Sequence, residues 1–106
     1  MNRDIFQAIA DPTRRAILVL IAATAMTPNA IADQFDISRQ ATSKHIQVLM
    51  ECGAVEQERA GREIYYKVNL EKMSEIDMWL EQFRKLWEAR YHNLDNLLAN
   101  LNGEKK

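Results

Sequence analysis

The chain has 106 residues, of which 47% are apolar and 27% are charged, and its formal net charge is −1. This composition predicts a single small globular domain over residues 1–106, and the charge argues against a protein that binds nucleic acid through bulk positive charge. With three glycines and two prolines, a loop-rich or all-β fold is also disfavoured.

One Asp–Pro junction and one Thr–Pro junction predict where the second and third helices begin. A short helix over residues 3–9 comes first. Asp11 and Thr27 then each precede a proline, and both are residue types that cap a helix whose first position suits proline. We therefore expect a second helix over about 12–24 and a third over about 28–35.

Arg14 and Arg15 occupy an unfavourable position for cations. They fall in the first turn of the second helix, where the partial positive charge of the helix N-terminus disfavours Lys and Arg. Two interpretations stay open at this point. Either both side chains are solvated, or a carboxylate or a phosphate is their partner.

Residues 36–53, DISRQATSKHIQVLMECG, contain a tight turn and a complete helix. Asp36 and Ile37 form the turn, Ser38 is a preferred N-cap, and Gly53 tolerates the positive φ that commonly ends a helix. Two short helices separated by about three residues are typical of a helix-turn-helix motif. We therefore expect a recognition helix over about 38–52.

The predicted recognition helix has two chemically different faces. The face expected to turn to the core has Ala41, His45, Val48, Leu49 and Cys52. The opposite face has Arg39, Gln40, Ser43 and Gln47, with Thr42 and Lys44 on its flanks. This outward face has no carboxylate over residues 39–50, and its side chains are of the types that contact base edges in the major groove. We favour a DNA-contacting face over an ordinary solvated one, and a packed His45 over one that contacts bases.

The apolar pattern changes after Gly53. Residues 54–59 and 63–68 are strand-like, and the second segment alternates apolar and polar side chains. Gly61 suits the turn between them. A hairpin directly after a helix-turn-helix is a wing, here over about 54–68. A long helix should follow over about 71–101, capped by Asn69, which makes the fold mainly α with a two-stranded β wing: a winged helix-turn-helix.

Three separated motifs, DPTRRAIL, SRQATSKHIQVL and ECGAVEQERAGREIYYKV, occur in the order and spacing of a known family. Over residues 4–69 the chain resembles the ArsR family of bacterial winged helix-turn-helix repressors. The resemblance implies a cytosolic homodimer that regulates transcription, with wing-tip cations, here Arg62 and Arg59, at the minor groove or phosphates. Glu58 and Glu63 would then have to point away from these arginines or pair with them.

We therefore expect a repressor that binds a double-stranded, inverted-repeat DNA operator as a homodimer. The residues of the helix follow from its polar face and its N-cap, and the resemblance adds the two wing arginines as DNA-binding candidates. The candidates are Ser38, Arg39, Gln40, Thr42, Ser43, Lys44, Gln47, Arg59 and Arg62.

The long helix has a continuous apolar seam. Its spacing from Met73 to Leu101 follows a heptad pattern with one four-residue insertion between Trp87 and Tyr91. A helix of thirty residues spans about 45 Å, which is more than a domain of this size covers, so a second copy should bury the seam. An aromatic ligand pocket is the less favoured alternative. The dimerisation residues are Ile5, Phe6, Ile76, Leu80, Phe83, Trp87, Tyr91, Leu94 and Leu98.

We expect no metal site and no cofactor. One kind of metal site in the family uses clustered cysteines at the start of the third helix, but TPNAIADQFDI has neither Cys nor His, and soft metals require thiolates. A second kind uses His and carboxylates on the last helix, shared across the dimer. His92 and Asp95 on the last helix could provide two ligands per chain, although a solvated His is the favoured interpretation. Cys52 should be a core residue, and no inducer is assigned.

No nucleophile–base pair, phosphate-binding glycine loop or carboxylate pair is evident, so we expect no enzymatic activity. Two alternatives to a simple repressor stay open: a repressor that responds to metal or redox state, and a protein-interaction module that does not bind DNA. A single cysteine, no signal sequence and no apolar run of about 20 residues predict a cytoplasmic protein without membrane contact.

Overall fold

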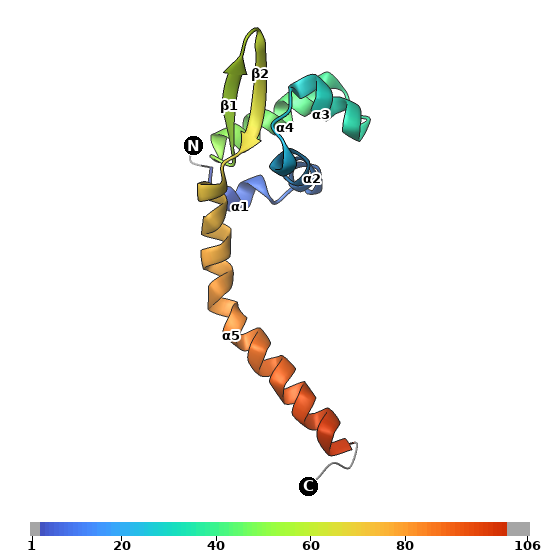
Figure 1. The fold of residues 1–106 in the computed structure, drawn as a ribbon, viewed down its shortest axis with the longest axis vertical. Coiled ribbons are helices and arrows are strands. Elements are labelled where there is room, and N and C mark those ends of the chain that lie inside the picture. Colours follow the sequence, from blue (N-terminus) through green and yellow to red (C-terminus); the bar gives the residue numbers. More distant parts are fainter. Residues whose placement is uncertain (1–2, 102–106) are drawn as a thin grey trace. The chain divides into compact units, whose positions relative to one another are not determined.

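The computed structural model describes residues 3–101, and it is mainly helical with one two-stranded antiparallel sheet (Figure 1). In chain order the elements are α1 (Ile5–Ala8), α2 (Pro12–Ala23), α3 (Pro28–Phe35), α4 (Arg39–Glu51), β1 (Val55–Ala60), β2 (Glu63–Val68) and α5 (Leu70–Leu101). The chain forms two compact units, residues 1–75 and 76–106. The winged helix-turn-helix lies in the first unit, which confirms the expected fold class.

Four helices begin where the sequence predicts, because each has a local cap. Asp11 accepts a hydrogen bond from the Arg14 N–H at 3.0 Å, and Thr27 accepts one from the Ala30 N–H at 3.2 Å. The equivalent bonds at the starts of α4 and α5 run from Ala41 to Ser38 Oγ and from Lys72 to Asn69 Oδ1, both at 3.0 Å. Each side chain satisfies an N–H group that the helix itself cannot.

Arg14 and Arg15 bind backbone carbonyls, an outcome that differs from both open interpretations. Arg14 donates through Nε to the Ala8 carbonyl at 3.0 Å and through Nη2 to the Gln7 carbonyl at 2.8 Å. Arg15 donates to the Ile9 carbonyl at 2.7 Å. These carbonyls lie at the end of α1, where the last carbonyls lack helical partners and the dipole favours cations. The two arginines therefore fasten α1 to α2.

The hydrophobic core of the first unit is built from every helix of the winged helix-turn-helix and from the base of the wing. α2 packs on α4 and on β2, and α3 packs on α4. The buried apolar residues are Ile5, Ala8, Ile17, Leu18, Ile21, Ile31, Ala32, Ile46, Leu49, Cys52, Ala54 and Val55.

The end of α4 is set by Gly53, as predicted. Its φ is +78°, a left-handed conformation that glycine adopts without a Cβ clash. The Gly53 N–H donates to the Met50 carbonyl at 3.0 Å, and the Ala54 N–H donates to the Leu49 carbonyl at 2.9 Å. This paired arrangement is a Schellman motif. It reverses the chain so that Val55 enters the sheet shortly after the end of α4.

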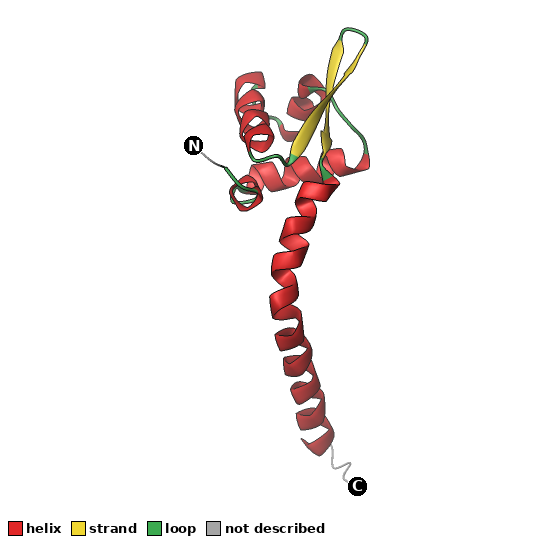
Figure 2. Ribbon diagram, turned by 90° about the vertical axis from the view of Figure 1, so that its left-hand side faces the viewer, coloured by secondary structure: helices red, strands yellow, loops and turns green. Residues whose placement is uncertain are grey.

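The wing is an antiparallel hairpin of two strands (Figure 2). Its register pairs Val55 with Val68 and Ala60 with Glu63. Only two residues join the strands, and Gly61, the first of them, has φ +65°, as a type II′ turn requires. A contact missed by the sequence analysis widens this sheet. Met26 and Tyr66 exchange two backbone hydrogen bonds, at 3.1 and 2.8 Å, so the segment before α3 adds a bridge to β2.

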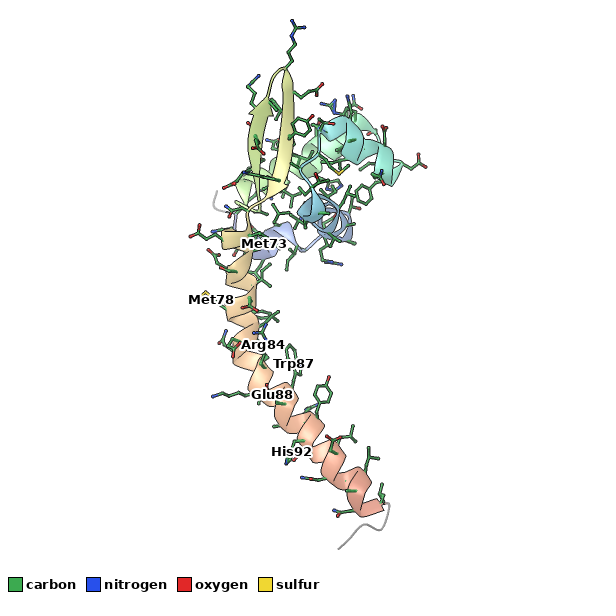
Figure 3. The ribbon with its side chains drawn as sticks, viewed as in Figure 1. Met73, Met78, Arg84, Trp87, Glu88 and His92 are labelled. Carbon is green, nitrogen blue, oxygen red and sulfur yellow. The ribbon has the colours of Figure 1, made fainter. Side chains whose placement is uncertain are left out.

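α5 contains no buried residue. Within the second unit, Trp87 and Met78 project from opposite sides of the helix (Figure 3), as their nine-residue separation requires. Trp87 is 47% exposed, and Tyr91, Leu94, Leu97, Leu98 and Leu101 are also exposed. No helix within residues 3–101 is long and apolar enough to span a membrane.

Candidate nucleic-acid interface

One side of α4 is fully open to solvent and rich in hydrogen-bonding groups. It presents the N-cap Ser38 and then Arg39, Gln40, Ser43, Lys44 and, one turn further along, Gln47, all of which are exposed. Glu51, the last residue, is the only carboxylate of the helix. The face therefore offers donors, acceptors and two cations in the half that a recognition helix presents to the major groove.

Thr42 does not belong to this face, and the prediction that it contacts DNA is wrong. Its side chain is fully buried, and its hydroxyl donates to the Ser38 carbonyl at 3.0 Å. Ile46 is buried beside it, whereas Ala41 and Val48, which were expected to face the core, are only partly buried. α4 is thus rotated from its predicted phase, because its actual neighbours α2 and α3 cover the side centred on Thr42, Ile46 and Leu49.

His45 is packed rather than presented to solvent, as expected. Its side chain is 24% exposed, and its Nδ1 lies 4.0 Å from Asp11 Oδ2. Asp11 is also the N-cap of α2, and the hydrogen bond from the Arg14 N–H is the main reason that its pKa lies below the usual value. The contact joins α4 to the start of α2.

Three polar contacts hold side chains of α4, two of them to neighbouring segments and one within the helix. Arg39 Nη1 donates to Asn29 Oδ1 on α3 at 3.0 Å. Gln47 Nε2 donates to Glu51 Oε2 at 3.3 Å, and Glu51 Oε1 lies 2.7 Å from Arg3 Nε. The face is therefore held in part before any ligand arrives.

The wing separates its charges between two faces. Successive strand residues point to opposite sides, so the register places Arg59 with Gln57 and Tyr66, and places Glu58 and Glu63 on the other side. The carboxylates thus point away from Arg59, one of the two options that the sequence left open. Arg62 is exposed in the turn, and no ion pair among residues 3–101 involves Arg59 or Arg62.

A shallow depression lies between α4, the start of α3 and the inner face of the wing. It is lined by Pro28, Arg39, Ser43, Ile46, Gln47, Met50, Gln57 and Tyr66. Gln57 Nε2 donates to the Tyr66 hydroxyl at 3.3 Å on its wing side. Asn29, Gln57 and Tyr66 also belong to this surface, although the sequence did not identify them as candidates. The alternation of β1 and β2 could have identified the latter two once the hairpin register was known.

The residues considered for sensing are not assembled into a site in the described part of the chain. Cys52 is buried, and burial raises the pKa of its thiol, which disfavours the reactive thiolate. Within residues 3–101 no three His, Cys, Asp or Glu side chains gather as metal ligands. His92 projects from a different side of α5 than Trp87 (Figure 3).

The residues predicted to form a dimer interface differ in exposure. Ile5 is fully buried in its own protomer, so its assignment to a dimer surface is wrong: it packs as part of the core. Ile76 and Leu80 are partly buried. The remaining members, Phe6, Phe83, Trp87, Tyr91, Leu94 and Leu98, are exposed by 36% or more.

Known proteins similar to this chain also contain a helix-turn-helix or are named as repressors. A family model described as a helix-turn-helix domain matches residues 3–58. The chain is 36% identical over 80 residues to the transcriptional repressor SdpR of Bacillus subtilis, covering 76% of this chain and 89% of that protein. It is 32% identical over 73 residues to a probable mercury resistance operon repressor of Streptomyces lividans, covering 69% of this chain and 58% of that one.

A solved structure extends the comparison to the whole fold. An ArsR-like transcriptional regulator from Rhodococcus sp. RHA1 superposes with a TM-score of 0.68 at 30% identity, covering 88% of each chain. The helix-turn-helix, the wing and the sequence identity therefore agree, and the chain belongs to the ArsR family of winged helix-turn-helix, DNA-binding transcriptional regulators.

Proposed function

We propose that this chain is a transcriptional repressor that binds an inverted-repeat operator as a homodimer. The outward face of α4 is the observation that carries the proposal. Gln40, Ser43 and Gln47 are exposed there together with Arg39 and Lys44. In this assignment the glutamines and Ser43 contact base edges, while the two cations contact guanine or the backbone.

The wing supplies the second contact. Arg62 at its tip and Arg59 on its inner face have no carboxylate partner within residues 3–101, so both are available to phosphates or the minor groove. In a chain with net charge −1, few cationic side chains are available to contact phosphates. The total number of phosphate contacts should therefore be small, and the salt dependence of binding should be shallow.

Dimerisation is proposed to occur through the second unit. Phe83, Trp87, Tyr91, Leu94 and Leu98 repeat along one helix and remain exposed in a single chain, and full burial of each such side chain stabilises by roughly 1.5–3 kcal/mol. Two copies related by a two-fold axis would bury this stripe against itself. The same symmetry would present two recognition helices to two half-sites, which is why the operator should be an inverted repeat.

Repression, rather than activation, is supported by the similarity to SdpR, which is named a transcriptional repressor. A dimer bound to a promoter can act simply by occupying it.

A gel-shift titration on the DNA upstream of the coding region tests the proposal, with excess non-specific competitor present. The wild-type protein should retain a specific complex. Gln40→Ala should weaken that complex by about 1–3 kcal/mol, or roughly 5- to 150-fold. Gln82→Ala, the same change at an exposed position of α5, is the matched control and should bind as wild type. Equal binding by all three proteins would reject the assignment of α4.

A further inference from the structure

Glu51 is a carboxylate at the end of a helix proposed to approach DNA, and its two oxygens have different partners. Oε1 lies 2.7 Å from Arg3 Nε. Oε2 accepts the hydrogen bond from Gln47 Nε2 at 3.3 Å. Arg3 comes from the segment before α1, so three side chains from two distant parts of the sequence form one chain of contacts.

The chemistry of the carboxylate dictates how Gln47 is turned. An ionised carboxylate only accepts hydrogen bonds, whereas the glutamine amide has a donor end and an acceptor end. The NH₂ end must therefore face Glu51, since the opposite orientation would set oxygen against oxygen. As a result Gln47 keeps Oε1 and one remaining N–H for a ligand.

Arg3 provides the reason that Glu51 stays in place. The long side chain of an exposed glutamate is free to rotate, and a free carboxylate beside DNA would repel phosphates. An arginine at 2.7 Å holds the carboxylate through a charge-assisted hydrogen bond and neutralises it. The pair thus fixes the position of the Glu51 carboxylate and reduces its repulsion of DNA phosphates.

We infer that the Arg3–Glu51 pair is a positioning device that makes Gln47 select bases with an exocyclic amino group. The inference rests on the proposed function. Adenine offers the N6 amino group to Oε1 and N7 to the remaining N–H, and cytosine offers its N4 amino group to Oε1. Guanine and thymine present oxygen acceptors where Oε1 would sit. The base facing Gln47 is therefore adenine first, then cytosine.

The test is a binding-site selection from a randomised DNA library with the full-length protein and its variants. Gln47→Leu identifies the operator position that Gln47 faces, since preference is lost there alone. Wild type should enrich adenine or cytosine at this position. Glu51→Ala frees the amide to turn, and should raise the share of guanine and thymine there by about fivefold or more. Arg3→Gln should act in the same direction, with a smaller change.

Two controls separate positioning from charge and from folding. Glu56→Ala removes an exposed carboxylate from the wing face opposite Arg59, and it should leave the preference at the Gln47 position unchanged. Circular dichroism should show that each variant keeps its helix content. Without DNA, the side-chain amide signals of Gln47 in an NMR spectrum should shift in Glu51→Ala, because the Nε2 hydrogen bond is lost.

Three results would overturn the inference, and each points to a different failure. If Glu51→Ala keeps the wild-type preference at the position that Gln47→Leu identifies, the positioning role is wrong while the base contact stands. If Gln47→Leu alters no position, Gln47 contacts no base, although the repressor function survives. If the wild-type protein enriches no sequence at all, the proposed function itself fails.

Discussion

Replacing Arg62 with alanine should weaken DNA binding by an amount that depends on the salt concentration. Arg62 lies in the two-residue turn of the wing, exposed and without an ion-pair partner within residues 3–101. One lost phosphate contact changes the slope of log affinity against log salt by about 0.9, and a dimer has two wings, so the slope should change by about 1.8. Between about 50 and 200 mM salt, the difference between the variant and wild type should therefore shrink by about tenfold.

Fluorescence anisotropy on specific and non-specific duplexes, each titrated at several salt concentrations, measures this slope. Lys67→Ala is the matched control, since Lys67 is an exposed cation on the wing face opposite Arg59 and pairs across the hairpin with Glu56. It changes the net charge by the same amount but should leave the slope near that of wild type. Equal slopes for wild type and Arg62→Ala would refute the wing contact, and equal changes in both variants would reduce it to a general charge effect.

Leu94→Asp should shift the protein toward monomer in light scattering and weaken operator binding about tenfold or more, because two linked half-sites gain affinity through effective concentration; a folded monomer with wild-type affinity would contradict the dimer. Gly53→Ala should lower the free energy of unfolding by roughly 1 kcal/mol in urea titration, since φ is +78° and the added Cβ would lie 3.3 Å from Lys72 Cε. Asp11→Ala should cost about 1 kcal/mol at neutral pH. Because the hydrogen bond from the Arg14 N–H holds the folded pKa of Asp11 below its ordinary value, this cost should disappear as the pH falls through the folded pKa; a pH-independent difference would rule out the charged cap. Zinc, cadmium, arsenite or nickel at micromolar levels should change operator affinity by less than about threefold, and a tenfold release by any of them would reveal a site.

Features that depend on residues a few positions apart are the ones the sequence alone determined. In each of the four caps, a side-chain oxygen accepts a hydrogen bond from the backbone N–H three residues later; the capping residues are Asp11, Thr27, Ser38 and Asn69. The order of helices, the turn and the hairpin follows from these caps and from glycine. These local hydrogen bonds depend little on the rest of the fold, so the starts and ends of the helices can be predicted without a structure.

Other features were decided only by which elements meet. Thr42 is buried because α2 and α3 cover a different side of α4 from the one that apolar periodicity suggested. Arg14 donates hydrogen bonds to two backbone carbonyls at the end of α1. These carbonyls come within its reach only when α1 packs beside α2. The bridge from Met26 to Tyr66 spans forty positions, and the Arg3–Glu51 contact spans nearly fifty. Such pairs leave no periodic trace in the sequence, because each results from the packing of the whole unit rather than from the spacing of neighbouring residues.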